Sequence, residues 1–149
     1  MLALVALTGV ALATPVAVLR IEPDGRLLPV GDGERYEYSY QQSIYQVPVY
    51  EEHLRDGNAL RIARVRSRDL RAVEYFRWDG EIRREGAEFV QDAPPNGVNL
   101  LAIRITHEGT QRLRGTGFDL TLRDAYGESL VTIVPARVPR LLALLGHAP

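Results

Sequence analysis

Residues 36–52 read YEYSYQQSIYQVPVYEE, and this stretch decides the fold. It holds five of the seven tyrosines, and Tyr36, Tyr38, Tyr40, Gln42 and Ile44 recur at every second position. Successive side chains of an extended strand point to opposite faces, so this spacing places all five on one face. Aromatic and β-branched residues suit a half-buried pleated surface. The stretch therefore predicts a strand over 36–44 that presents a tyrosine-rich face to the core.

The rest of the chain repeats this pattern of short extended segments between turns. Turn signals include Pro23-Asp24-Gly25, Asp56-Gly57 and residues 94–97. Further strands are expected at 16–22, 27–30, 60–68, 101–105, 118–122 and 130–134, with another extended piece ending at 53–55. Helical spacing occurs only at 69–76. The sequence therefore predicts an all-β fold, a compact sandwich or barrel-like antiparallel sheet with one short helix.

The composition excludes several kinds of chemistry and indicates none. A length of 149 residues and a net charge of -1 fit one globular domain without affinity for nucleic acid. All 18 basic side chains are arginine and there is no cysteine. Schiff-base chemistry, thiol catalysis and disulfides are therefore excluded. We expect no cofactor, because neither glycine pair, 31–33 or 115–117, has the third glycine of a dinucleotide loop.

The first 13 residues are almost entirely apolar and end in the small-x-small step Ala11-Leu12-Ala13. This pattern is typical of a secretory signal, although no arginine or lysine precedes it. The apolar run extends to Leu19, about the minimum for crossing a bilayer, and a buried core segment is the alternative. We predict a signal peptide or membrane anchor over 1–15, a single β domain over 16–149, and an exported or periplasmic, extracytoplasmic location.

The tail is a second apolar segment, LLALL at residues 141–145. It is far too short to span a membrane. We expect a helical turn that docks on the core and closes it, and the alternative is an exposed apolar patch for a partner.

Residues 40–52, YQQSIYQVPVYEE, resemble the signature of a bacterial family, domain of unknown function (DUF) 1850. That signature runs loosely Tyr-x-His-Ser-Val-x-x-x-Pro-x-x-Glu after an N-terminal signal or anchor. The histidine of the family falls at Gln42 here, and an amide does not titrate. Members are generally exported and often encoded beside TAXI-class tripartite (TRAP) solute transporters. The resemblance implies an exported protein whose partner is a transporter or a solute-binding subunit, and it implies no activity.

Glu51 and Glu52 are neighbouring carboxylates. On a strand they point to opposite faces, so they cannot share a substrate proton, and we expect only one to point inward. If the chain reverses near residues 46–48, Gln42 and Glu51 face each other across a hairpin, and we predict a hydrogen bond between their side chains. His53 shares the face of Glu51, which makes a proton-transfer pair conceivable. Two ligands are too few for a metal, so no metal is expected.

The tyrosines offer a second kind of site. A sugar or aromatic ligand site could be lined by Tyr36, Tyr38, Tyr40, Tyr45 and Tyr50. Tyr45 and Tyr50 are the better candidates, because they lie nearest the expected reversal. Aromatic residues on strands belong more often to the core. Ser43 lacks the elbow motif of a hydrolase nucleophile, and we include it only as a candidate binding residue.

Three arginines, Arg64, Arg66 and Arg68, fall on one face of the expected 60–68 strand. Guanidinium groups bind carboxylate or phosphate in bidentate fashion, so Arg64 and Arg66 are candidate binding residues. The alternative is a solvated edge strand that charge protects from aggregation.

The preferred interpretation is a non-enzymatic extracytoplasmic β domain that binds a protein or a small solute beside a membrane transport system. One alternative is a small exported hydrolase or lyase that uses Glu51 and His53. The other is a purely structural envelope protein.

Overall fold

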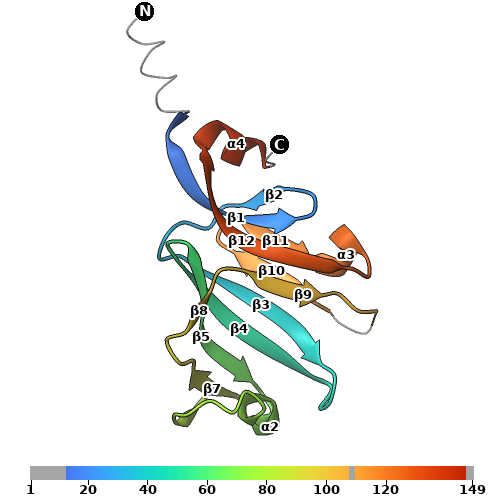
Figure 1. The fold of residues 1–149 in the computed structure, drawn as a ribbon. Coiled ribbons are helices and arrows are strands. Elements are labelled where there is room, and N and C mark those ends of the chain that lie inside the picture. Colours follow the sequence, from blue (N-terminus) through green and yellow to red (C-terminus); the bar gives the residue numbers. More distant parts are fainter. Residues whose placement is uncertain (1–12, 108–109, 147–149) are drawn as a thin grey trace, which may run out of the picture.

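The computed structural model describes residues 13–107 and 110–146, and every strand pairing in them is antiparallel. The strands form two sheets (Figure 1). The smaller sheet has the order β2 (Arg26–Leu28), β1 (Pro15–Glu22), β12 (Leu130–Pro139) and β9 (Leu101–Arg104). The larger has the order β11 (Phe118–Thr121), β10 (Arg112–Gly115), β3 (Arg35–Gln42), β4 (Val47–Asp56), β5 (Ala59–Ser67), β7 (Glu88–Asp92) and β6 (Ile82–Glu85), and β8 (Gly97–Val98) also pairs with β5.

The prediction of an all-β antiparallel fold is confirmed. The expected short helix is α2 (Leu70–Glu74), and the side chain of Asp69 caps it by accepting a hydrogen bond from the backbone N–H of Arg71. The described chain contains two further short helices, α3 (Leu122–Tyr126) and α4 (Arg140–Leu145); α4 corresponds to the helical turn expected at 141–145, whereas α3 was not predicted. The α3 segment follows a strand without a clear helical repeat, so its pattern gave no signal.

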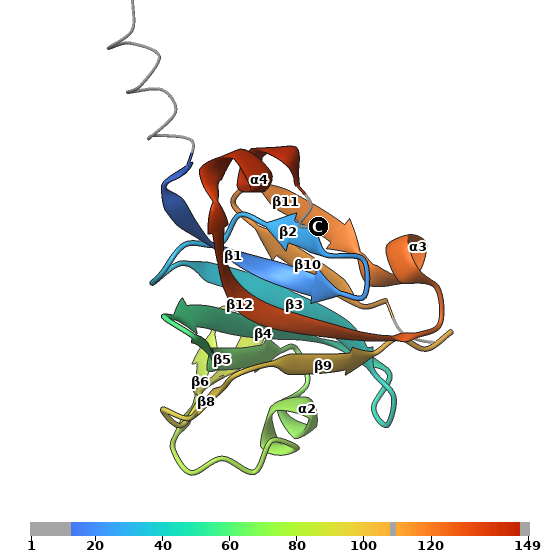
Figure 2. The same ribbon diagram turned by 45° about the horizontal axis from the view of Figure 1, so that its top comes forward.

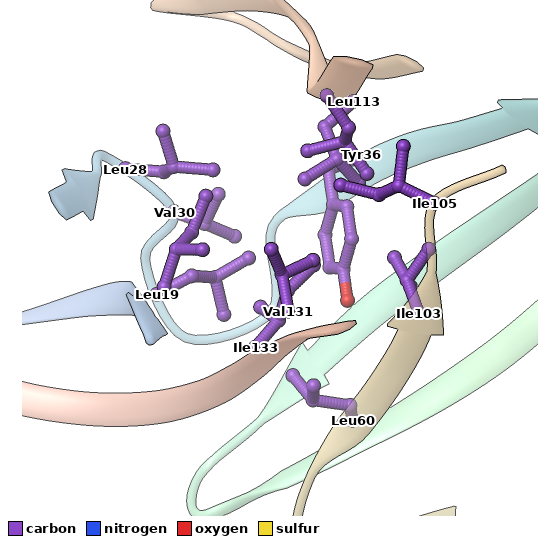
Figure 3. Packing of buried hydrophobic residues seen from close by; sticks show 12 residues of the cluster. Leu19, Leu28, Val30, Tyr36, Leu60, Ile103, Ile105, Leu113, Val131 and Ile133 are labelled. Carbon is purple, nitrogen blue, oxygen red and sulfur yellow. The ribbon is translucent and has the colours of Figure 1, made fainter. Parts of the chain in front are cut away.

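The main core lies between the two sheets, which face each other in Figure 2. Tyr36, Leu60 and Leu113 come from the larger sheet and pack against residues of the smaller one (Figure 3). The partners from the smaller sheet include Leu19, Ile21, Leu28, Ile103, Val131 and Ile133. These buried apolar side chains supply the main driving force for stacking the sheets.

Strand β3 is the tyrosine-rich strand that the sequence predicted, but it is shorter than expected. Tyr36 and Gln42 are buried and the tyrosines between them are half-buried, so they share the inner face. The strand ends at Gln42, and Ile44 is 59% exposed in the following turn. The prediction that Ile44 continues the inner face is therefore wrong.

The turn after β3 explains this early end. The backbone N–H of Gln46 donates to the carbonyl of Gln42 over 2.8 Å, and Gln46 has a φ of 54°. A left-handed conformation is uncommon for a residue other than glycine, so residue type did not mark the reversal. The resulting register pairs Gln42 with Val47, and Tyr38 with Glu51.

A second cluster covers the other half of the larger sheet. Val49 and Val65 of the sheet pack against Ala72 and Val73 of α2, and Trp78 packs at the margin. One half of the inner face of the larger sheet is therefore covered by the smaller sheet, and the other half is covered by α2. Polar side chains on this inner face lie between these two apolar clusters.

The described structure begins just before β1, whose first residue, Pro15, pairs with Pro139. The predicted signal or anchor over 1–15 lies mostly outside the described residues, and it stays a prediction. Residues 15–19 belong to β1, so they do not extend that segment. Within 13–107 and 110–146, no helix combines the length and hydrophobicity needed to cross a membrane. In the tail, α4 packs Leu142 and Ala143 on the core, as expected, while other leucines stay exposed.

Candidate functional site

The inner face of β4 carries a row of polar side chains that is unusual for a core. Val49, Glu51, His53 and Arg55 alternate with exposed or half-buried residues, and all four are buried. Glu52 is half-buried on the opposite face and binds Arg35, as expected for a neighbour on a strand. The prediction that only one of the two acids points inward is confirmed.

Glu51 and His53 form a direct pair. His53 Nε2 lies 3.0 Å from Glu51 Oε2, and only 2% of the His53 side chain is exposed. The His53 ring stacks on Tyr36, with 5.1 Å between the ring centroids, and meets Tyr38 edge-on at 6.4 Å. An ionised carboxylate only accepts, so Nε2 of His53 is the donor of this contact when Glu51 is ionised. The pair is thus held by hydrogen bonding and ring packing together.

The tyrosines of β3 extend this pair towards the surface. The Tyr40 phenol lies near the Glu51 carboxylate, and its ring lies 5.1 Å from that of Tyr38. Burial, and then the nearby Glu51 carboxylate, raise the pKa of the Tyr36, Tyr38 and Tyr40 phenols above the ordinary value. The three phenols therefore stay protonated at neutral pH and can donate hydrogen bonds.

Tyr40 also borders a pocket of about 650 Å³ at the β3–β4 turn, which we call the hairpin pocket. Its wall on the hairpin side is formed by Tyr40, Gln41, Gln42, Ser43, Ile44 and Gln46. The opposite wall is formed by Tyr75, residues 104–107, Gln111, Glu128 and Ser129. The pocket is within the usual size range for small-molecule sites.

Two polar atoms at the hairpin pocket lack a hydrogen-bond partner among the described residues. Gln111 is 7% exposed, and its Nε2 donates weakly to the carbonyl of Arg104 over 3.4 Å, but its buried Oε1 accepts no hydrogen bond within the described chain. Ser129 Oγ is likewise buried and unpaired among the described residues. Leaving such groups unpaired costs roughly 1–3 kcal/mol each, so they favour a polar occupant.

The predicted hydrogen bond between Gln42 and Glu51 is absent, and that prediction is wrong. Gln42 pairs with Val47, and its Oε1 accepts from the backbone N–H of Tyr45 over 2.8 Å. The reversal comes earlier than residues 46–48, which places Tyr38 instead of Gln42 opposite Glu51. Gln42 therefore stabilises the turn that forms one wall of the hairpin pocket.

The other predicted binding residues separate into two groups. Tyr40, Gln42 and Ser43 border the hairpin pocket, whereas Tyr45 packs on the α2 cluster under the guanidinium of Arg71, 4.9 Å away. Tyr50 lies on the outer face of the larger sheet, with the Arg66 guanidinium 4.4 Å above its ring. The structure does not bring Tyr45 and Tyr50 together in one site.

Arg64 and Arg66 point to the outer face and bind acids of the sheet itself. Arg66 contacts Glu88 at 2.7 Å and Glu37 at 2.5 Å, and Arg64 lies 3.6 Å from Glu52. The edge-strand interpretation is wrong, because β5 lies between β4 and β7. These guanidinium groups already have partners, so they offer little to an external anion.

Sequence reasoning missed Arg55, which is fully buried. Its guanidinium lies 3.2 Å from Asp32 and donates to the carbonyls of Ala136, at 3.1 Å, and Val30, at 3.4 Å. It shares strand parity with Glu51 and His53, and that parity could have identified it. Gln111, Ser129 and Tyr75 were also missed, and no local motif marks them.

His53 also borders a separate, apolar pocket of about 310 Å³. Leu60, Trp78, Val98 and Leu101 are among the residues that line it. None of its lining residues is a serine, threonine or cysteine, so the pocket offers no side-chain nucleophile of these types. Among the described residues, no group of three histidines, cysteines or acids is arranged to hold a metal ion.

No family model, no curated protein and no solved structure matches this chain. The resemblance of residues 40–52 to the DUF 1850 family stays a prediction. Function has to be inferred from the geometry of the site itself.

Proposed function

We propose that the protein is a non-enzymatic binding domain that holds a small polar solute in the hairpin pocket. The observation that carries this proposal is the unpaired Gln111 Oε1, buried at the wall of that pocket. Ser129 Oγ adds a second hydrogen-bonding atom. A ligand that donates to Gln111 and exchanges a hydrogen bond with Ser129 would satisfy both groups.

The lining favours a neutral, polyhydroxylated solute such as a sugar. Tyr40 and Tyr75 provide aromatic surface, and Gln42, Gln111 and Ser129 provide neutral donors and acceptors. Aromatic rings pack on the C–H faces of sugars, while amides and hydroxyls bind their hydroxyl groups. Arg104 and Glu128 contribute opposite charges, so the pocket has no strong preference for a charged ligand.

The resemblance to the DUF 1850 family supports a cellular setting for this binding. On that basis we propose that the protein acts outside the cytoplasm as an accessory of a TRAP-type transporter. Pull-down from envelope extracts, with a transporter or solute-binding subunit as the expected partner, tests this part separately. A purely structural envelope protein remains the outcome if neither a partner nor a solute binds.

A thermal-shift survey of neutral sugars and polyols against the full chain tests solute binding. A ligand that binds the folded state raises the melting temperature with its concentration. Tyr75→Ala, at a side chain that is 55% exposed, should weaken binding of the best ligand roughly fivefold through lost ring contact. Tyr50→Ala, on the outer face, is the matched control and should leave affinity unchanged. Equal losses in both variants, or no ligand at all, would contradict the proposal.

A hydrolase or lyase that uses Glu51 and His53 is the second candidate. The 3.0 Å contact orients the imidazole as in a base–carboxylate pair, and His53 borders an apolar pocket. The low exposure of the pair argues against it, because a substrate proton has to come within hydrogen-bond reach of the base. Turnover of an ester, lactone or glycoside substrate by the wild type, lost in His53→Ala, would favour this candidate over simple binding.

A further inference from the structure

The outer face of α4 is an uncovered apolar surface, which we call the leucine face. Leu141, Leu144 and Leu145 are 48%, 71% and 66% exposed. The other side of the helix already packs on the core through Leu142 and Ala143. Arg140 is the only polar residue of the helix, so α4 is apolar on both sides. A helix of this kind is expected where something apolar covers its outer side.

The leucine face continues onto the neighbouring sheet. Leu144 borders an apolar pocket of about 390 Å³ that Val16 and Val18 of β1 also line. This pocket therefore connects the leucine face to β1, where Val16 is half-buried and Val18 is buried.

The contact of α4 with Thr14, just before β1, suggests what covers the leucine face. The backbone N–H of Arg140 donates to the carbonyl of Thr14 over 3.0 Å, and Pro15 pairs with Pro139. Residues 1–13, which precede this contact, contain no charged side chain. Because residues 15–22 belong to β1, any anchor formed by the apolar start would end at about Thr14, next to the first residue of α4.

We propose that the leucine face lies in the interface of the bilayer that holds residues 1–13. If those residues enter the hydrocarbon, Thr14 lies at the membrane surface, and the hydrogen bond to Arg140 places α4 there as well. Exposed leucines at that depth move from water into the acyl boundary, which is favourable. The Arg140 side chain, exposed at the start of the helix, lies where it can extend to lipid phosphates.

This arrangement also determines how the hairpin pocket is oriented relative to the membrane. In both views α4 and the start of β1 lie at one end of the molecule, and the β3–β4 turn lies at the opposite end (Figures 1 and 2). The turn that borders the hairpin pocket would therefore project into the aqueous phase. The membrane contact does not depend on what the hairpin pocket binds.

The absence of cysteine allows a direct test with single-cysteine variants of the full chain. Leu144→Cys would carry an environment-sensitive fluorophore on the leucine face, and Ile44→Cys, at a side chain that is 59% exposed in the β3–β4 turn, is the control. With vesicles of phosphatidylcholine and a minor fraction of phosphatidylglycerol, we expect a blue shift and quenching by nitroxide-labelled lipid at position 144 only.

Several results would overturn the proposal. One is a full chain that does not bind the vesicles, and another is a vesicle-bound chain whose label at 144 stays in water. A blue shift at 144 without lipid that grows with protein concentration would assign the face to a second copy of the chain. The same shift without concentration dependence would assign it to the chain's own residues.

A second pair of variants measures the contribution of the leucines to binding. Leu144→Asn with Leu145→Asn should reduce vesicle partitioning of the full chain roughly tenfold or more, because two apolar side chains no longer enter the interface. Val98→Asn with Leu100→Asn, at apolar side chains that are 53% and 49% exposed outside α4, should leave partitioning unchanged. Equal effects of the two pairs would overturn the proposal.

Discussion

His53 Nε2 lies 3.0 Å from Glu51 Oε2, although the two residues are separated in sequence by Glu52, which points to the other face of the sheet. The contact joins next-nearest neighbours on one face of β4, where their side chains lie side by side. Tyr38 is the cross-strand partner of Glu51 and Tyr36 that of His53. The result is a polar cluster enclosed between the sheets, with Tyr40 as its link to the hairpin pocket.

Removing the carboxylate of Glu51 should destabilise the fold strongly. Glu51→Ala leaves His53 Nε2 without its partner in a buried setting, which we expect to lower the free energy of unfolding by about 3 kcal/mol. Urea unfolding followed by circular dichroism measures this change. Glu52→Ala is the matched control on the opposite face, where loss of the contacts with Arg35 and Arg64 should cost less than about 1 kcal/mol. Similar losses in both variants would show that the cluster contributes little.

Gln42 and Glu51 should act independently in a double-mutant cycle. Gln42→Ala removes the acceptor for the N–H of Tyr45, and we expect a loss of about 1 kcal/mol. Since Gln42 pairs with Val47, about 13 Å along β4 from Glu51, the coupling energy with Glu51→Ala should be below about 0.5 kcal/mol. Urea unfolding of the two single variants and the double variant gives this coupling. A value above about 1 kcal/mol would indicate the direct contact that the sequence predicted.

The strand pairing shows where prediction from sequence succeeds and where it stops. A period of two identified the inner face of β3 and the shared face of Glu51 and His53, because alternation is a local property of extended chain. The partner of Gln42 depends on where the turn lies. The turn uses a positive φ at Gln46, and a positive φ cannot be predicted from sequence where the residue is not glycine. Because the chain reverses a few residues earlier than expected, the predicted contact is wrong while the predicted fold class is right.

The sequence predicted the residues on one wall of the hairpin pocket but not those on the other, and the reason is different. Tyr40, Gln42 and Ser43 stood out because they lie in one tyrosine-rich stretch. Gln111 and Ser129 come from segments far along the chain, and only the arrangement of the two sheets brings them to the same pocket. The position of β5 inside the larger sheet is likewise a property of topology, which is why the arginines of β5 were assigned to an edge.

The buried Arg55 should contribute more to stability than any arginine of the outer face. Arg55→Ala leaves a cavity and removes donors from the carbonyls of Val30 and Ala136, for an expected loss of about 3 kcal/mol. Arg55→Met keeps most of the volume and should lose less. Arg66→Ala is the matched surface variant, with an expected loss below about 1 kcal/mol, even though Arg66 contacts two acids. Urea midpoints in the reverse order would contradict this assignment.

Alkaline pH should destabilise the protein through the tyrosines of β3. The phenols of the unfolded chain ionise near pH 10, whereas burial raises the pKa of Tyr36, Tyr38 and Tyr40 in the folded state. Above about pH 10 the unfolded state therefore binds fewer protons than the folded state, so the free energy of unfolding falls as the pH rises. Below that pH the contribution is fully present. Phenolate absorbance and circular dichroism should consequently change together for these three residues.

Tyr40→Phe tests whether the tyrosines that ionise above pH 10 in that titration are those of β3. The variant should reduce the absorbance change that accompanies unfolding by one phenol, because partial burial and the nearby Glu51 raise the pKa of Tyr40. Tyr126→Phe is a useful comparison, since burial and Asp24 raise the pKa of Tyr126 only to about 12. Loss of the Tyr126 phenol should therefore change the absorbance at a lower pH than loss of the Tyr40 phenol does. Smooth ionisation of all tyrosines near pH 10, with the circular dichroism of the folded protein intact, would show that the phenols of β3 are open to solvent.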